Sequence, residues 1–172
     1  MPILIRDLQK AALRLKPQRI AKSFTEALAK AQATAFLCHS HKDDELAEGQ
    51  QVLLAENGWD VYIDWKDSAM PPVPDQETAE RIKQQISARD WFLFLATPNS
   101  TASRWCPWEI GYADSTRGDN KILLIATYDD SGQYYGNEYL QLYRQVTTAK
   151  GGKLAAFPAG AATNGILLEN LK

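Results

Sequence analysis

The sequence predicts an α/β fold, a doubly wound parallel sheet of five strands, preceded by an N-terminal helical extension. From Thr34 onward, short apolar runs alternate with helical stretches. The runs are continuously apolar, which is typical of parallel strands covered on both faces. Strand–helix alternation of this kind indicates a doubly wound α/β domain.

The N-terminal segment differs from the rest because its apolar residues recur at helical spacing. Two amphipathic stretches, separated by Pro17, are carried by Ile5, Leu8, Ala12 and Leu15 and then by Ile20, Phe24, Leu28 and Ala31. A proline in this position ends or kinks a helix. We therefore expect three parts: a helical extension over 1–33, the main domain over 34–150, and a C-terminal strand and tail over 151–172 that complete it.

The elements of the main domain follow from the apolar runs. Five strands are expected, at Thr34–Cys38, Trp59–Ile63, Trp91–Thr97, Ile122–Thr127 and Leu154–Phe157. Helices are expected near 43–56, 75–88, 104–117 and 136–147, the last of which would bury a cluster of tyrosines, Tyr134, Tyr135, Tyr139 and Tyr143. Ligands of such sheets bind beyond the carboxyl ends of the strands, which selects the loops that start at His39, Asp64 and Pro98.

Composition and charge exclude several classes of protein. The chain has 172 residues, 45% of them hydrophobic, a net charge of −2 and two cysteines, with no disulfide framework suggested. The strongly apolar run from Trp91 to Ala96 is too short to span a bilayer, and the N-terminus lacks an apolar signal region. Scattered basic residues in 1–33, with no aromatic residues between them, favour a solvated helix face over a nucleic-acid site. We expect a cytoplasmic protein.

The motif Ser100-x-x-Ser103-x-Trp105-Cys106-x-x-Glu109 contains the most distinctive candidate site. Ser103 suits the N-cap of a helix, and Trp105 and Glu109, four residues apart, then share one helix face. An aromatic plane beside a carboxylate would suit a flat, cationic nicotinamide ring with its ribose. Spacing alone favours a different interpretation, with Trp105 in the core and Glu109 as a solvated helix residue.

This motif resembles the signature that opens the third helix of TIR domains. Two further segments resemble the same family in the same order: the first strand and its loop, Ala35-Phe36-Leu37-Cys38-His39-Ser40-His41-Lys42-Asp43-Asp44, and the second strand, Gly58-Trp59-Asp60-Val61-Tyr62-Ile63-Asp64. The resemblance covers about residues 34–147 and implies a flavodoxin-like fold. The Trp105–Glu109 pair is similar to that of the catalytic TIR branch, whose members hydrolyse NAD, cyclise it or exchange its base.

The resemblance implies an enzyme that cleaves the nicotinamide–ribose bond of NAD with Glu109 as its essential carboxylate. It further implies substrate contacts from Phe36, Ser40, Asp43, Trp65, Ser103 and Trp105. Nicotinamide leaves as a neutral ring from a cationic one, so no general acid is needed, and one carboxylate can stabilise the oxocarbenium-like centre. NAD is then the substrate, and no cofactor is expected.

Neither a metal nor a phosphate-binding loop is predicted. His39-x-His41 with Asp43 and Asp44 fixes no third ligand by its spacing, and loop polarity explains these residues better. The sequence contains no G-x-G-x-x-G or Walker lysine motif, so NAD would not be held in the Rossmann manner.

The resemblance extends to the stand-alone TIR proteins of Thoeris anti-phage defence. It implies a cyclic ADP-ribose isomer, or linear ADP-ribose, as a signal for a separate effector protein. It also implies self-association through TIR contacts and the Asp64–Pro74 loop, whose proline cluster is Met70-Pro71-Pro72-Val73-Pro74. Long loops in compact domains are usually functional.

Two alternatives remain open: a non-enzymatic TIR interaction module, and a nucleoside deoxyribosyltransferase-like enzyme with a glutamate nucleophile.

Overall fold

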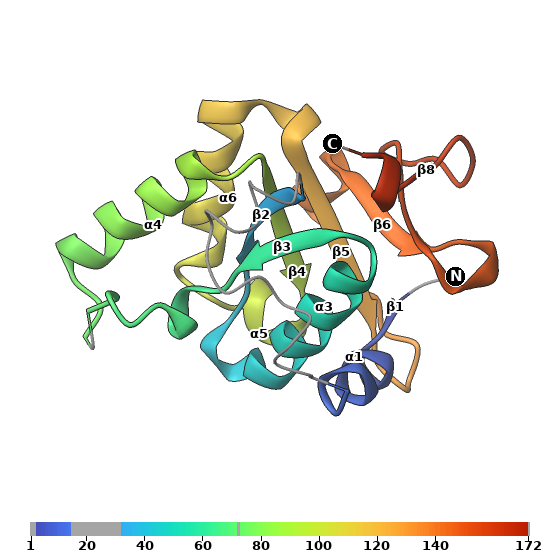
Figure 1. Cartoon of the computed structure of the whole chain (residues 1–172), viewed down its shortest axis with the longest axis horizontal. Helices are drawn as coiled ribbons and strands as arrows, with labels where there is room; N and C mark the ends of the chain where they lie inside the picture. The colour runs from blue at the N-terminus through green and yellow to red at the C-terminus, as the bar shows by residue number, and fades with distance from the viewer. Residues whose placement is uncertain (1–2, 15–31, 72, 172) are drawn as a thin grey trace.

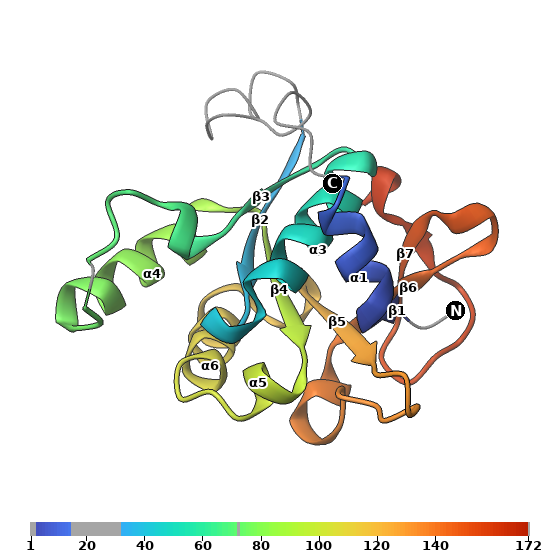
Figure 2. The ribbon, with the colours of Figure 1, turned by 90° about the horizontal axis from the view of Figure 1, so that it is seen from below.

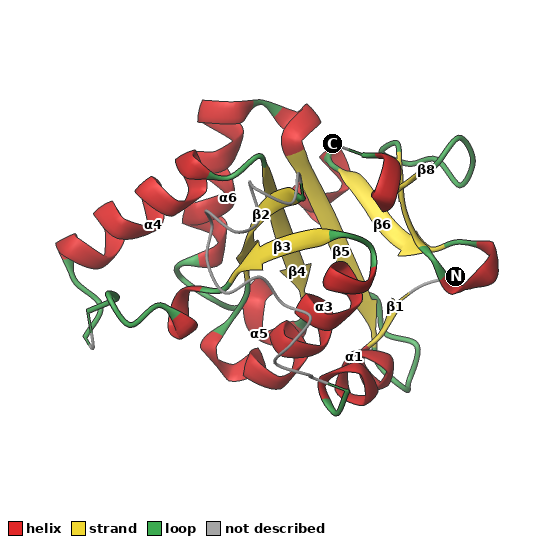
Figure 3. Cartoon of the chain, in the orientation of Figure 1, coloured by secondary structure: helices red, strands yellow, loops and turns green. Residues whose placement is uncertain are grey.

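A mixed β-sheet forms the centre of the molecule (Figures 1 and 3). The structure, a computed structural model, describes residues 3–14, 32–71 and 73–171. Five strands run parallel in the order β3-β2-β4-β5-β6: Trp59–Tyr62, Ala33–Cys38, Trp91–Ala96, Ile122–Tyr128 and Arg144–Thr148. Two antiparallel strands, β7 (Leu154–Phe157) and β8 (Ile166–Leu167), extend the sheet beyond β6. The predicted doubly wound α/β fold class is confirmed.

Helices cover both faces of this sheet (Figure 2). One face carries α1 (Ile5–Ala12) and α3 (Asp44–Glu56), and the other carries α4 (Gln76–Ala88) and α6 (Cys106–Arg117). Successive residues of a strand point to opposite faces. In β2, Ala35 and Leu37 therefore join the core under α1 and α3, whereas Phe36 and Cys38 join the core under α4 and α6. Both faces are apolar, as the continuous apolar runs predict.

Local sequence fixes where the helices begin and end. Asp75 and Thr78 form a reciprocal capping box at the start of α4, in which each side chain accepts from the backbone N–H of the other. After α3, Gly58 adopts a positive φ of 82° and donates to the carbonyl of Ala55, which ends the helix and turns the chain into β3. Glycine adopts this conformation without the steric cost other residues meet.

The prediction of a helix near 136–147 is wrong. A 3₁₀ helix spans Glu138–Leu142, and β6 follows at once. The β6 sequence Arg-Gln-Val-Thr-Thr contains three β-branched residues, which favour a strand. Consequently the expected strand at Leu154–Phe157 exists but lies antiparallel beside β6, and the described part of the chain contributes eight strands to the sheet rather than five. Of the tyrosines, Tyr143 is buried whereas Tyr139 is 40% exposed.

The N-terminal segment begins as a strand, although the sequence predicts a helical extension. Ile3 and Leu4 form β1, which pairs in parallel with Thr127 and Tyr128 at the end of β5. The chain then enters α1, which packs against α3 so closely that a Cβ added to Gly49 would lie 1.9 Å from the carbonyl oxygen of Leu8. The second expected helix, from Ile20 to Ala31, lies outside the described residues.

Among the helices that the structure describes, none combines the length and the apolar character needed to cross a bilayer.

Candidate active site

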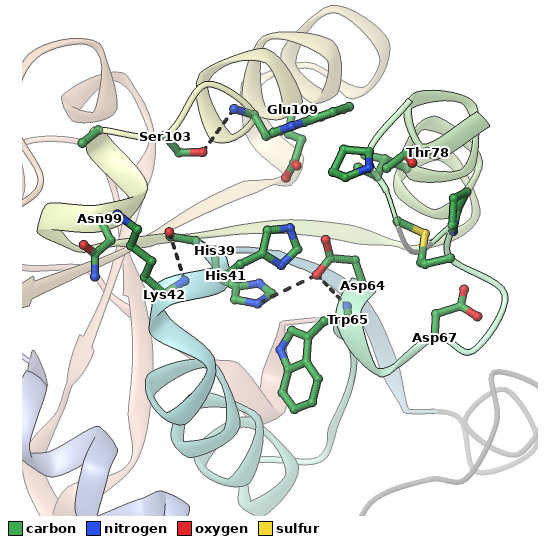
Figure 4. Close-up of a pocket in the computed structure, with 17 residues that line it drawn as sticks. His39, His41, Lys42, Asp64, Trp65, Asp67, Thr78, Asn99, Ser103 and Glu109 are labelled. Atoms are coloured by element: carbon green, nitrogen blue, oxygen red, sulfur yellow. Dashed lines mark hydrogen bonds and ion pairs between the residues drawn. The ribbon is translucent and has the colours of Figure 1, made fainter. Parts of the chain in front are cut away.

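A cavity of about 660 Å³ opens at the carboxyl ends of β2, β3 and β4 (Figure 4). Its walls come from the loops that follow these strands and from α4 and α6, as the topological rule predicts. Its volume lies within the usual range of small-molecule sites. The lining residues are His39, Ser40, His41, Lys42, Asp64, Trp65, Asp67, Met70, Pro71, Pro74, Thr78, Ile82, Asn99, Ala102, Ser103, Trp105 and Glu109.

Glu109 lies in the first turn of α6 and points into this cavity (Figure 4). The turn is held by Ser103, whose hydroxyl oxygen accepts from the N–H groups of Trp105 and Cys106 at 3.1 and 3.3 Å. Glu109 is only 4% exposed. Burial raises the pKa of its carboxyl well above the ordinary value, and the negative charges of Cys106 and Asp64 raise it further. In the unliganded site the ionised form of Glu109 is therefore disfavoured.

Trp105 lines the cavity on the same helix face as Glu109. Its ring meets that of Trp108 edge to face, with 5.5 Å between the centroids, and Trp108 in turn stacks on Tyr112 at 6.3 Å. Trp108 is 37% exposed and does not line the cavity. This row of rings on α6 fixes the orientation of the Trp105 indole beside the carboxylate.

His39 and Asp64 face each other across the cavity from Glu109 (Figure 4). The Nδ1 atom of His39 lies 3.1 Å from the carbonyl oxygen of Leu37, so Nδ1 carries the hydrogen in this contact. Its Nε2 atom lies 3.8 Å from Oδ1 of Asp64 and has no hydrogen-bond partner. The same Asp64 oxygen accepts from the Trp65 N–H at 2.8 Å.

The loop 64–74, in which the structure describes all residues but 72, is held to α4 by Asp67. One carboxylate oxygen of Asp67 accepts from Arg81 at 2.8 Å and from the Tyr62 hydroxyl at 2.8 Å. The other accepts from the Ala69 N–H at 2.9 Å. Burial alone would raise the pKa of Asp67, but the hydrogen bonds from Ala69, Arg81 and Tyr62 lower it below the ordinary value. Trp65, 38% exposed, stands at the cavity mouth.

Five of the seven sequence-predicted site residues meet in this cavity: Ser40, Trp65, Ser103, Trp105 and Glu109. Phe36 does not, because β2 directs it into the core, where it stacks between Tyr62 and Phe92 at 5.6 and 5.7 Å. Asp43 does not line the cavity either. Its two carboxylate oxygens accept from the Thr97 hydroxyl and the Asn99 amide, which ties the loop after β2 to the segment after β4.

Other lining residues were not predicted as substrate contacts, although the sequence analysis places several of them in the ligand-binding loops. His39, Asp64 and Asn99 are among the first residues after β2, β3 and β4, where the carboxyl ends of the strands converge. Thr78 and Ile82 come from α4, which no motif connects with the site. Within the ranges that the structure describes, no three His, Cys, Asp or Glu side chains are grouped so as to hold a metal ion.

Comparison with known proteins identifies the family of the chain. The family model described as TIR domain matches residues 35–154, and the chain belongs to this family. It is similar to the probable 3' cyclic ADP-D-ribose synthase ThsB' of Bacillus cereus (strain MSX-D12), with 37% identity over 120 residues. The match covers 67% of this chain and 60% of the relative, so the chain spans less than two thirds of the relative's length.

Proposed function

We propose that this TIR domain cleaves the bond between nicotinamide and ribose in NAD, with Glu109 as the catalytic carboxylate. The single observation that carries the proposal is the placement of Glu109, 4% exposed, with the Trp105 indole in one cavity of about 660 Å³. The name of the relative describes a synthase of a cyclic ADP-ribose, which supports NAD as the substrate here.

The chemistry follows from the charge of the substrate. Nicotinamide in NAD is a cationic ring, and the pKa of the buried Glu109 is raised. A cation beside the carboxylate favours its ionised form, so binding of the substrate supplies a counter-charge. As the C–N bond lengthens, positive charge moves from the ring to the ribose. A fixed carboxylate stabilises that charge without reorganisation.

Trp105, Trp65, Ser40 and Ser103 complete the proposed substrate site, since all four line the cavity. The indoles provide flat surfaces for the two ring systems of a dinucleotide. The hydroxyls provide hydrogen bonds to ribose and phosphate oxygens. The reaction uses NAD as substrate and needs no cofactor.

We further propose that the product is a cyclic ADP-ribose isomer that signals to a separate effector in anti-phage defence, as the name of the relative suggests. Self-association through TIR contacts and the loop 64–74 would complete the site, because this loop forms one wall of the cavity through Trp65, Asp67 and Pro74. Activity that rises faster than protein concentration is the expected sign of such assembly.

The test is incubation of the protein with NAD, followed by chromatography and mass spectrometry of the products. Nicotinamide release is expected, and Glu109→Gln should lower it by about 10²–10³-fold while the fold persists. Glu45→Gln, an exposed carboxylate in the first turn of α3, is the matched control and should retain activity. Undiminished release by a folded Glu109→Gln protein would contradict the proposal. Cleavage of deoxynucleosides but not NAD would favour a deoxyribosyltransferase-like enzyme, and no turnover under any condition would favour an interaction module.

A further inference from the structure

A second carboxylate, Asp64, faces the same cavity as Glu109 from the opposite wall (Figure 4). We propose that Asp64 is a second catalytic residue, which accepts the proton of the oxygen nucleophile that captures the ribosyl cation, and that His39 is its positioning residue and holds that proton next. This inference rests on the proposed NAD cleavage. It assigns the acceptor of the nucleophile's proton, a role that Glu109 does not fill.

The proposed reaction releases a proton that the site must accept. The C–N bond breaks and its electron pair leaves with neutral nicotinamide. A lone pair on a hydroxyl oxygen, from the same dinucleotide or from water, then forms a C–O bond at the ribosyl carbon. The proton of that hydroxyl must move to a base. Glu109 serves the cation best while it stays ionised, so a separate base avoids neutralising it at the moment it is needed.

Asp64 is suited to this role by its position. It is the second residue after β3, it lines the cavity, and it is 7% exposed. Its negative charge contributes to the raised pKa of Glu109, which places the two carboxylates within electrostatic reach of each other. Because Asp64 comes from the 3₁₀ turn after β3 and Glu109 from α6, a substrate carbon between them can be stabilised from one side and its nucleophile deprotonated from the other.

His39 offers Asp64 a neighbouring nitrogen atom, Nε2, to which a proton can pass. In the neutral tautomer that donates from Nδ1 to the Leu37 carbonyl, the buried Nε2 carries a lone pair, and it lies 3.8 Å from a carboxylate oxygen of Asp64. In that tautomer both facing atoms are hydrogen-bond acceptors. A proton delivered to Asp64 and passed to Nε2 converts this contact into a charge-assisted hydrogen bond, which is shorter and stronger. The other titratable groups of this loop at the cavity wall are Lys42 and His41, and the ring of His41 lies 6.2 Å from that of His39.

Base exchange distinguishes the proposed proton transfer from cleavage of the C–N bond, because its nucleophile carries no proton. A pyridine base added to the reaction attacks the ribosyl cation through its ring nitrogen, which carries no hydrogen, and forms an NAD analogue. Base exchange therefore needs Glu109 but no proton acceptor. The measured quantity is the ratio of oxygen-capture products, cyclic plus linear ADP-ribose, to exchanged dinucleotide, and this ratio does not depend on the amount of folded protein.

The key variant is Asp64→Asn, because asparagine keeps an oxygen to accept from the Trp65 N–H. The ratio should fall by about 10²-fold, the usual contribution of a positioned base, while base exchange stays within about threefold of the wild-type rate. Asp44→Asn, an exposed carboxylate outside the cavity lining, should leave the ratio unchanged. An unchanged ratio in Asp64→Asn would overturn the assignment, and so would a parallel loss of exchange and capture.

His39→Asn tests the positioning role. The asparagine amide can still donate to the Leu37 carbonyl, but Nε2 is removed. We expect the ratio to fall by about tenfold, at the lower end of contributions from proton-transfer groups, with base exchange retained. A ratio equal to wild type would remove His39 from the proposal. Wild-type protein that neither releases nicotinamide nor exchanges it would instead refute the proposed NAD cleavage, and the proton acceptor with it.

Discussion

Burial of the Glu109 carboxyl favours the proposed reaction but lowers the stability of the unliganded protein. Without a bound cation, the folded protein favours the protonated form, since its pKa is raised well above the ordinary value. A folded-state pKa above the unfolded one gives stability that is fully present below the unfolded pKa, about 4.3 for glutamate, and is lost as pH rises through the folded pKa. Ionised Glu109 therefore destabilises the unliganded fold at neutral pH.

The first prediction concerns the destabilisation caused by ionised Glu109. Glu109→Gln removes the ionisation, so the Tm difference between the variant and the wild type should shift in favour of the variant between about pH 4 and pH 8. Each unit by which folding raises the pKa corresponds to about 1.4 kcal/mol. Thermal unfolding of both proteins across this pH range checks it. Glu45→Gln, at an exposed position, should show no such trend, and a pH-independent difference for Glu109→Gln would contradict the prediction.

The two tryptophans of α6 give a second prediction at this scale. Trp105 lines the cavity, whereas Trp108 does not line it and contacts the Trp105 ring. Stacking of a base on an aromatic side chain is worth about 1–3 kcal/mol, so Trp105→Ala should weaken NAD binding by about tenfold or more. Trp108→Ala should change it by less than about threefold, because only the packing of Trp105 is affected. The measurement is equilibrium binding of NAD to both variants, each in the Glu109→Gln background to prevent turnover. Equal losses of NAD affinity in the two variants would contradict the prediction.

At this scale the sequence predicted the residues that lie near one another in the chain. Trp105 and Glu109 share one turn of a helix, and helical spacing is enough to bring them together. Phe36 could not be placed in the same way, because a continuously apolar strand does not reveal which of its alternate residues meets which face. The position of Asp43 could not be predicted for a different reason: its partners, Thr97 and Asn99, follow another strand.

At the scale of elements, the loop 64–74 is tied to α4 by the ion pair between Asp67 and Arg81, 2.8 Å long. The Arg81 side chain is 33% exposed, so the pair contributes at the modest level of partly solvated ion pairs, about 1 kcal/mol. The lowered pKa of Asp67 means that this contribution is present above the unfolded pKa of aspartate and is lost as pH falls through the lowered folded value.

A third prediction follows for the loop. Arg81→Met should increase hydrogen exchange of the amides in the loop 64–74 by about fivefold at neutral pH, the equivalent of about 1 kcal/mol. Exchange in β4 should not change. Gln84→Met, an exposed position on the same helix, serves as control. Loop exchange in Arg81→Met that equals the control would show that the loop is held by other contacts.

The elements that the sequence predicted well are the strands buried on both faces and the helices that cover them. Strands β2 to β5 and helices α3, α4 and α6 carry apolar residues whose spacing alone decides between strand and helix. β6 was missed because its pattern is mostly polar, with only Val146 deeply buried. Its strand character comes from β-branched side chains and from pairing with both β5 and β7.

At the scale of the whole molecule, the attachment of the N-terminal segment depends on one close approach. Gly49 of α3 leaves the space that the backbone of α1 occupies at Leu8. The fourth prediction is that Gly49→Ala displaces α1 and lowers stability by about 1–3 kcal/mol, the usual cost of overpacking. Gly111→Ala is the matched control, since a Cβ there meets no atom within 4 Å, and it should stabilise α6 by about 0.5–1 kcal/mol. Chemical denaturation of both variants provides the comparison; equal effects of the two would contradict this account.

The pairing of β1 with the end of β5 also sets an order of events during synthesis. Ile3 pairs with Thr127, so a ribosome adding about 5–20 residues per second makes the partner strand roughly 6–25 s after the first one. Until then Ile3, buried in the finished protein, has no partner strand. The residues of β1 thus leave the ribosome well before their partner strand, and a chaperone that binds short apolar segments would meet them before β5 does.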